Sequence, residues 1–407
     1  MKVIILGAGG RGRNYTRFCL QYGADIVAIA DPDRKKLNKL ALDFNIGDEK
    51  LYSNWQEVMK EDKFADAVIN ATPDKVHYPS TMQALDKGYA VLLEKPMSDN
   101  EQECIDMVKK AEEKNLLLMV CHVLRYAPFF EKLKEIIDEG RVGELVHLQM
   151  TENCAYWHFA HSYVRGVFRN ETISSPFILA KSCHDLDLIG YLTGKKCLSV
   201  VSEGNLKYYK EENAPEGAPK YCLDGCPCET SCPYFAPRLY LKQISKVGWP
   251  TQTISSDTSF AARYEALRKG QYGRCVFHCD NDVCDHQSAI FNMEDGLTAS
   301  FNMTGFSSEN TRTLRFFGTK GDIRGHLDKG NIEVYDFLTK EKEVIPIEYE
   351  SIQSGHGGGD SRLLYDFLDG VGKKGGDLKT LARLSLQSHR MAFAAEKSRK
   401  EGKRIYL

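Results

Sequence analysis

Apolar residues follow one pattern in the first third of the chain and another in the rest, and the change falls near residue 125. Before that point, short uninterrupted apolar runs alternate with segments of helical period. An apolar run without polar alternation is typical of a strand that is buried on both faces of a sheet. Such runs predict strands at Val3–Leu6, Ile26–Ala30, Ala67–Asn70, Ala90–Leu93 and Leu116–Cys121. Helical segments separate them, including Thr81–Lys87 and Asn100–Lys114, the second capped by Ser98 or Asp99. This alternation predicts a doubly wound parallel sheet.

The remaining residues predict a second, different domain. Helical period marks Phe129–Asp138 and Phe177–Leu192, and Glu144–Thr151 is a predicted strand. From about residue 286, short alternating runs separated by turns predict antiparallel strands at His286–Met293, Leu297–Met303, Thr311–Phe317, Asn331–Tyr335 and Glu343–Ile347. We therefore expect an α/β domain at residues 1–122 and an α+β domain at residues 123–407. The second domain should contain a large open, mainly antiparallel sheet and carry a Cys-rich insertion near residues 205–255.

A glycine motif joins the first predicted strand to a helix at Arg13–Tyr22. Gly7 permits a tight turn, Gly9 lets a pyrophosphate approach the backbone, and Gly12 lets the helix pack closely on the strand. The amino end of the helix would face the phosphates. The loop residues expected to contact a dinucleotide are Gly7, Gly9, Gly10, Arg11 and Gly12. The motif and its position predict a Rossmann-type dinucleotide-binding domain, the alternative being a glycine turn that binds nothing.

The second predicted strand ends at an acidic residue, Asp31, about 20 residues beyond the glycines. A carboxylate at this place accepts hydrogen bonds from the adenosine ribose of a dinucleotide. It would also repel the 2′-phosphate of NADP, so Asp31 favours NAD as the cofactor. Arg34 stands close enough to keep NADP open as the less favoured alternative.

The charge balance and the hydropathy exclude several classes of partner. Lys and Arg number 54 against 56 Asp and Glu, so the chain offers no electrostatic field for nucleic acid or an anionic membrane. No apolar run reaches transmembrane length, and the first strand begins at once, which leaves no room for a signal peptide. We therefore expect a cytoplasmic protein whose 13 cysteines are reduced thiols or metal ligands.

Two short motifs follow predicted strands at the sheet edge where doubly wound folds bind ligands. Glu94-Lys95-Pro96 comes after Ala90–Leu93, and a lysine there could act as a general acid or base on a substrate hydroxyl. A solvated lysine before a proline turn is the alternative. Thr72-Pro73 ends the preceding strand segment, and His77 opens the helix that follows.

These motifs, together with Arg125-Tyr126-x-Pro128, resemble the Gfo/Idh/MocA family, named after glucose–fructose oxidoreductase, inositol dehydrogenase and a rhizopine catabolism protein. The resemblance spans both expected domains. It implies that Lys95 is a catalytic residue beside the nicotinamide. The further residues expected beside the cofactor are Thr72, Pro73, His77 and Glu94.

The resemblance also implies a second-domain histidine that contacts the substrate hydroxyl and acts as acid or base. Its motif falls on Lys181-Ser-Cys-His184-Asp-Leu-Asp187, so His184 is the second catalytic candidate. Lys181, His184 and Asp187 are at helical spacing and can share one face. Asp187 could orient the imidazole, or it could be a capping or ion-pair residue. Inositol-dehydrogenase-like members carry an aspartate where this chain has Ala180, which places the chain in a different subgroup.

Other side chains are candidates for binding the substrate. The stretch from Asn153 to Tyr163 combines aromatic rings with hydrogen-bonding groups, which suits sugar rings, although a surface loop could pack its own aromatics in the same way. His356 lies in a glycine-rich segment, where the backbone could come close to a ligand and His356 could contact it. The alternative is a plain flexible loop. The residues expected to bind substrate are Arg125, Tyr156, His158, Lys181, Asp187 and His356.

Four cysteines lie within eleven residues, at Cys222, Cys226, Cys228 and Cys232. Such a cluster in a reducing compartment suggests a tetrahedral structural zinc site. The spacing departs from the usual pairs, so an iron–sulfur cluster, free thiols and a redox disulfide stay open.

The sequence thus predicts an NAD-dependent dehydrogenase that oxidises a secondary hydroxyl of a sugar, glycoside or cyclitol. One alternative is redox-assisted glycoside cleavage with the NAD recycled in place, and another is a non-catalytic dinucleotide-binding sensor. The sheet of the second domain should have an uncovered apolar face. Such a face favours a homodimer or homotetramer.

Overall fold

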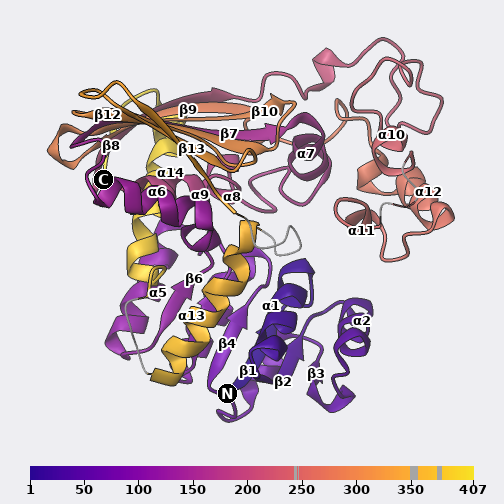
Figure 1. The fold of residues 1–407 in the computed structure, drawn as a ribbon. Coiled ribbons are helices and arrows are strands. Elements are labelled where there is room, and N and C mark those ends of the chain that lie inside the picture. The colour runs from indigo at the N-terminus through magenta and orange to yellow at the C-terminus, as the bar shows by residue number, and fades with distance from the viewer. Residues whose placement is uncertain (243–244, 246, 349–355, 374–377) are drawn as a thin grey trace.

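Two sheets organise the part of the chain that the structure describes (Figure 1). This computed structural model describes residues 1–242, 245, 247–348, 356–373 and 378–407, and of His356 only the backbone. The first sheet has six strands in the order β3-β2-β1-β4-β5-β6, and the second has nine in the order β14-β13-β12-β11-β7-β10-β9-β8-β15.

All strand pairs of the first sheet are parallel, so the predicted doubly wound sheet is confirmed. Its strands are β1 (Lys2–Leu6), β2 (Asp25–Ala30), β3 (Leu51–Tyr52), β4 (Ala67–Asn70), β5 (Ala90–Leu93) and β6 (Leu118–Val120). The connecting helices are α1 (Gly10–Gln21), α2 (Arg34–Phe44), α3 (Trp55–Lys60), α4 (Asp74–Asp86) and α5 (Glu101–Glu113). Every residue of β4 and β5 is buried, because helices cover both faces of the sheet.

Two local predictions in this domain were wrong. Helix α4 begins at Asp74 and not near Thr81, because Pro79 is accommodated inside the helix, where proline is normally unfavourable. The cap of α5 is Asn100, and neither Ser98 nor Asp99 is the cap. The side-chain oxygen of Asn100 accepts hydrogen bonds from the amides of Gln102 and Glu103.

The second sheet is mixed, because β7 lies in its middle and separates the predicted meander into two parts. Strand β7 pairs antiparallel with β11 and parallel with β10. The expected strands correspond to β7 (Leu145–Ala155), β9 (His286–Met293), β10 (Thr298–Ser307), β11 (Thr311–Gly318), β13 (Asn331–Asp336) and β14 (Lys342–Pro346). Three further strands were not predicted, namely β8 (Cys197–Asn205), β12 (Gly321–His326) and β15 (Ile405–Tyr406).

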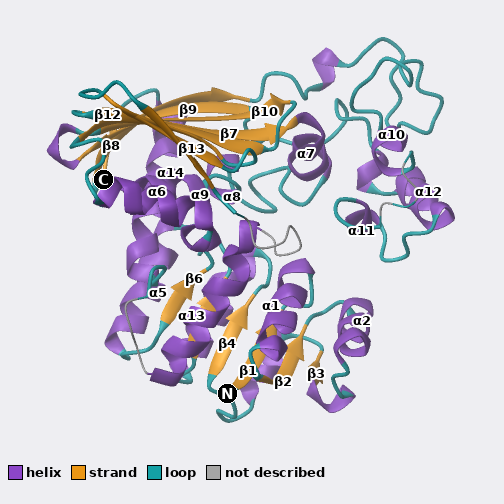
Figure 2. Ribbon diagram, viewed as in Figure 1, coloured by secondary structure: helices purple, strands orange, loops and turns teal. Residues whose placement is uncertain are grey.

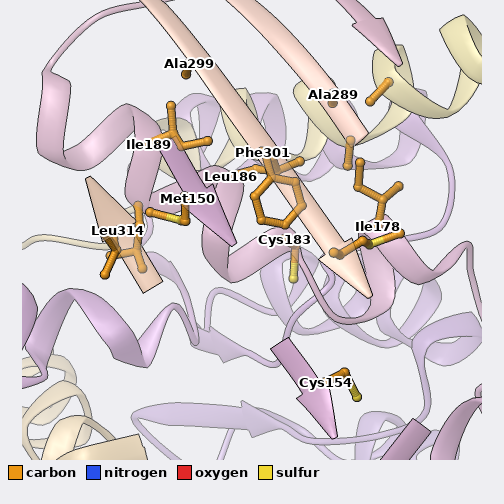
Figure 3. Close-up of a cluster of buried hydrophobic side chains, with 14 of the residues drawn as sticks. Met150, Cys154, Ile178, Cys183, Leu186, Ile189, Ala289, Ala299, Phe301 and Leu314 are labelled. Carbon is orange, nitrogen blue, oxygen red and sulfur yellow. The ribbon is translucent and has the colours of Figure 1, made fainter. Parts of the chain in front are cut away.

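Helices pack on one face of this sheet and form the core of the second domain (Figure 2). They include α6 (Pro128–Asp138), α8 (Phe177–Ala180), α9 (Cys183–Thr193) and α14 (Ala382–Glu401). Figure 3 shows Leu186 and Ile189 of α9 packed with Met150 of β7 and Phe301 of β10. Alternate residues of the strands point into this core, as the period of a strand requires.

The opposite face of the second sheet is mainly polar, and the expectation of an apolar open face was wrong. The outward side chains of the central strands include Gln149, Ser288, Ser300, Asn302 and Arg315. Most residues that alternate with the core-facing ones are polar, and the exposed apolar side chains of this face include Val201 and Ile290, which pair across β8 and β9. The homodimer or homotetramer stays a prediction, but an apolar sheet face no longer supports it.

An insertion of residues 206–285 connects β8 to β9 and lies at one end of the second sheet (Figure 1). It contains the helices α10 (Ala236–Tyr240), α11 (Thr251–Ile254) and α12 (Phe260–Lys269). Cys222, Ala236, Tyr240, Leu267 and Tyr272 form a small core of its own. Beside it, β7 continues into the short helix α7 (Tyr156–Phe159) and a π-helical turn at Ala160–Arg165.

The last two helices connect the two domains. Helix α13 (Gly359–Lys373) places Leu363 and Phe367 in the core on one face of the first sheet, together with Val3 and Ile5 of β1. Helix α14 packs on the core of the second sheet. The carboxyl end of the first sheet therefore faces the second domain. No helix among the described residues combines the length and the apolar character needed to cross a membrane.

Candidate active site

The glycine loop has the backbone geometry that a dinucleotide pyrophosphate requires. Gly7 has φ of +97°, and a Cβ atom there would overlap the carbonyl of Ala71. A Cβ atom at Gly12 would overlap the carbonyl oxygen of Gly7. A Cβ atom at Gly9 or Gly10 would meet nothing within 4 Å. The loop is thus closed towards the protein at Gly7 and Gly12, and it is open at Gly9 and Gly10, where the amino end of α1 begins.

Asp31 lies beside this loop at the end of β2. One carboxylate oxygen accepts a hydrogen bond from the amide of Ala8 at 2.8 Å, and the other accepts one from the amide of Asp33 at 2.8 Å. Arg34 is exposed in the first turn of α2. The structure therefore brings Asp31 to the glycine loop, as expected of a residue that binds the adenosine ribose.

Two of the predicted cofactor residues, Arg11 and Glu94, form an ion pair with each other. Arg11 also pairs with Asp360 at the start of α13, at 2.6 Å, and the hydroxyl of Tyr15 donates to Glu94 at 2.6 Å. Burial alone would raise the pKa of Glu94, but Arg11 and then Lys95 outweigh it and lower that pKa. Glu94 is therefore a carboxylate that holds Arg11 in place, and cofactor contact by either residue stays a prediction.

Thr72 and His77 join the loops that follow β4 and β5. The hydroxyl of Thr72 donates to the side-chain oxygen of Asn70 at 2.7 Å. The two ring nitrogens of the buried His77 lie 2.8 Å from the carbonyl oxygen of Thr72 and 2.7 Å from that of Pro96. His77 thus fixes the loop that carries Lys95, and Pro73 precedes the first residue of α4.

Lys95 reaches from the first domain to the second. Its ammonium group donates a hydrogen bond of 2.9 Å to the carbonyl oxygen of Ala180, the last residue of α8. The final carbonyl groups of a helix have no partner within the helix and are free to accept such a bond. The main chain at Ala180 therefore supplies the acceptor oxygen for Lys95.

His184 is the second residue of α9 and is almost completely buried. Its ring makes an edge contact with the ring of His122, which follows β6, at 5.6 Å between centroids. The ring of His389 of α14 also contacts that of His122, at 5.6 Å between centroids. Burial lowers the pKa of His122 well below its usual value and lowers that of His389 to about 4, so both rings are neutral near pH 7. His389 was not predicted, since no motif marks it.

Arg125, in the segment that follows β6, and Asp187 of α9 pair with each other close to the domain boundary. Two guanidinium nitrogens of Arg125 donate to the two carboxylate oxygens of Asp187, at 2.7 and 2.6 Å, and a third donates to the carbonyl of Lys379. Both side chains are buried. Nε2 of His122 lies 3.8 Å from a carboxylate oxygen of Asp187. Substrate contact by Arg125 and Asp187 stays a prediction, and their contacts here are those of a structural ion pair.

Lys181, which is partly exposed, belongs to a group of four charges whose other three members are buried. It pairs with Glu152 of β7 at 3.3 Å, and Arg312 of β11 pairs with Glu152 and with Asp185 of α9, both at 2.7 Å. Burial raises the pKa of Asp185 to about 6, whereas Arg312 and Lys181 outweigh burial at Glu152 and lower its pKa. Sequence reasoning missed this group, although Glu152 was detectable as a carboxylate at a core-facing position of a strand.

The remaining predicted substrate residues lie on α7 or outside the described side chains. Tyr156 is exposed and makes an edge contact with Tyr234 of the insertion. His158 is bonded to Asn310 at 2.7 Å and carries a pKa lowered to about 3, chiefly by burial. His356 begins a 3₁₀ turn before α13, and its side chain lies outside the described part of the structure.

The four predicted metal ligands come together without forming a metal-binding group. Cys222, Cys226, Cys228 and Cys232 line one small cavity of about 10 Å³, together with Cys275 and the buried Arg165. Within the described residues, no group of three or more His, Cys, Asp or Glu side chains is placed so that it could hold a metal ion. The structural zinc stays a prediction.

Both halves of the chain match known family descriptions. Residues 1–122 match the description "Oxidoreductase family, NAD-binding Rossmann fold", and residues 134–407 match "Oxidoreductase family, C-terminal alpha/beta domain". Together these matches cover nearly the whole chain and define one family of two-domain oxidoreductases.

Individual relatives are distant in sequence. The oxidoreductase-family protein YteT of Bacillus subtilis is 25% identical over 374 residues, which are 87% of this chain and 84% of that protein. The scyllo-inositol 2-dehydrogenase (NAD(+)) of the same organism is 27% identical over 210 residues, 51% of this chain and 58% of the relative.

Solved structures share the fold over the full length. A levoglucosan dehydrogenase in complex with NADH and levoglucosan has a TM-score of 0.74 at 16% identity, and the alignment covers 100% of this chain and 99% of the other. An oxidoreductase from Agrobacterium radiobacter in complex with NAD+, L-tartaric acid and magnesium has a TM-score of 0.72 at 16% identity, with coverage of 100% and 98%.

Proposed function

We infer that this chain, which belongs to the Gfo/Idh/MocA family of oxidoreductases, is an NAD-dependent dehydrogenase of carbohydrate or cyclitol hydroxyl groups. The observation that carries the proposal is the hydrogen bond from Lys95 to the carbonyl of Ala180. It places an ammonium group of the dinucleotide-binding domain next to the helix that carries His184. Relatives named as inositol and levoglucosan dehydrogenases support the class of substrate.

The residues present fit a dinucleotide at the carboxyl edge of the first sheet. The open backbone at Gly9 and Gly10 would receive the pyrophosphate, and Asp31 would bind the adenosine ribose. NAD supplies a hydride acceptor when it is bound. The preference for NAD over NADP is part of this proposal and depends on the charge of Asp31.

The proton of the reacting hydroxyl would pass to a side chain of this protein. His184 and Lys95, the lysine only in its neutral amine form, are the candidates, because both lie at the junction of the two domains near the end of α8. Lys95 is held in place by the Ala180 carbonyl, and its loop is held by His77. A positioned acid or base of this kind contributes about two to four orders of magnitude in rate.

The test compares NADH formation by the wild type and by Lys95→Met and His184→Ala over a panel of sugars, glycosides and cyclitols. Each variant should lose at least about two orders of magnitude in kcat and keep its NAD affinity. Lys75→Met is a matched control, since it removes an exposed lysine of α4 that pairs with Asp99. A Lys95→Met protein with near wild-type kcat would refute the mechanism. Release of an aglycone without net NADH would instead indicate redox-assisted glycoside cleavage.

A further inference from the structure

Three aromatic rings meet beside the candidate active site, and the proposed reaction gives none of them a role. Trp157 and His158 come from α7, and Trp249 comes from the insertion just before α11. The ring centroid of Trp249 lies 5.4 Å from that of Trp157 and 4.8 Å from that of His158. We call these three residues the aromatic patch. Trp249 keeps 41% of its surface exposed, so the patch presents aromatic surface to a ligand.

The aromatic patch begins next to the charged residues of the site. His158 is close enough to Lys181 for the charge of this lysine to be, after burial, a cause of the low pKa of the ring. Lys181 follows Ala180, whose carbonyl group binds Lys95. Lys181 is therefore one residue from the acceptor of Lys95 and within electrostatic reach of His158 in the aromatic patch.

His158 adds a directional hydrogen-bonding group to the patch. The side-chain oxygen of Asn310 accepts from the amide of Ala155 and lies 2.7 Å from Nδ1 of His158, so Nδ1 carries the proton and donates. Because a neutral imidazole has only one N–H group, Nε2 is an acceptor. The patch thus combines two indole rings with one acceptor for a ligand hydroxyl.

The insertion holds Trp249 in place before any ligand binds. His161 of the π-helical turn makes an edge contact with Trp249, stacks on Tyr272 at 4.9 Å between centroids, and is hydrogen-bonded to the hydroxyl of Tyr240 at 2.8 Å. Both tyrosines belong to the core of the insertion. A ligand would therefore not have to order the ring of Trp249, and this lowers the entropic cost of binding.

We propose that Trp157, His158 and Trp249 form a second carbohydrate subsite, which binds the sugar ring or aglycone next to the ring that is oxidised. The inference rests on the proposed function and narrows it, because it assigns glycosides or disaccharides as substrates in place of free monosaccharides and cyclitols. The apolar C–H face of a sugar packs on an indole ring, and a ring hydroxyl donates to Nε2 of His158.

The experiment compares matched pairs of probes, each a p-nitrophenyl glycoside and its free sugar, in the gluco, galacto and manno series. NADH formation gives KM, and calorimetric titration of the NADH-loaded protein, which has no hydride acceptor, gives Kd without turnover. Trp249→Ala should raise KM and Kd for the glycoside about tenfold and change those for the free sugar less than about twofold. Trp157→Leu removes a ring from the other element of the patch and should act in the same direction. The proposal can therefore still be tested if one of the two variants fails to fold.

Phe260→Ala is the matched control, since Phe260 is an exposed ring of the same insertion that stacks on Tyr264. It should leave both probes unaffected. Equal effects of Trp249→Ala on the binding of glycoside and free sugar, or no effect on either, would overturn the subsite. NADH formation by the wild type would in that case still support the proposed function. Glycoside binding that is lost in Trp249→Ala without NADH formation from any probe would uphold the subsite and refute the proposed function.

Discussion

Replacement of Asp187 distinguishes a structural ion pair from a substrate contact at the domain boundary. In the folded protein Arg125 donates two hydrogen bonds to Asp187, at 2.7 and 2.6 Å, and the two side chains are 7% and 1% exposed. In Asp187→Asn the amide nitrogen would face the guanidinium group, and Arg125 would stay buried without a counter-charge. The pair joins the segment after β6 to helix α9, so the packing of α9 on that segment depends on it.

The magnitude follows from burial and distance. Two unit charges about 4 Å apart attract by about 4 kcal/mol at an effective dielectric constant near 20. Removal of one partner of a buried pair typically destabilises a protein by about 3–5 kcal/mol, because the other charge stays buried. At about 2–4 °C per kcal/mol for a large domain, the melting temperature should fall by roughly 6 °C or more.

The assay is thermal unfolding of Asp187→Asn, Arg125→Met and the double variant, together with KM for the best substrate of the panel. The double variant should be less destabilised than the sum of the single variants, since no buried charge is left. Glu135→Gln, which loses the exposed pair with Lys132, is a control and should change the melting temperature little. A melting temperature within about 2 °C of the wild type, with a raised KM, would refute the structural role and support substrate binding.

Three further predictions concern the cofactor, the pH dependence and the cysteines. Asp31→Ala should relax the preference for NAD, measured as the ratio of the Kd values for NADP and NAD, and a wild type that prefers NADP would contradict the argument from its charge. Burial keeps several histidines neutral in the folded state, so the unfolded state binds more protons below pH 6.5 and stability falls as pH falls. Each histidine contributes about 1.4 kcal/mol per pH unit down to its folded pKa, and the raised pKa of Asp185 offsets one of them below about pH 6. The histidines concerned are His158 and His161, with pKa values lowered to about 3, His389, with one lowered to about 4, and His122, whose pKa burial lowers well below its usual value. Urea unfolding at pH 6 and pH 5 should show this loss of stability. His158→Gln should lower the number of protons taken up on unfolding by about one, and an unchanged slope of unfolding free energy against pH would contradict the assignment. If Cys222 and its neighbours bind zinc, elemental analysis should find about one zinc per chain, and chelation should leave NAD binding intact; four free thiols without metal would refute the zinc.

The sequence by itself determined the parallel sheet and the geometry of the glycine loop. Strands β4 and β5 have the bounds predicted from their apolar runs, because a strand buried on both faces is mainly apolar along its length, and β4 ends at the buried, hydrogen-bonded Asn70. Gly7 and Gly12 occupy places that no side chain can fill, and this requirement is local to the β1–α1 turn. Such features depend on neighbours in the chain, and a pattern of residues is enough to reveal them.

Only the tertiary structure decided the partners of the candidate site residues. The acceptor of Lys95 is a main-chain oxygen of Ala180, which no side-chain pattern could reveal. Asp187 meets Arg125, 62 residues earlier in the chain, and Trp249 meets His158 across the insertion. The strand β7 enters the middle of the second sheet because it pairs with strands about 150 residues away. Contacts of this kind depend on packing between elements distant in sequence, and the direction of a side chain across such a boundary is fixed only when both elements are in place.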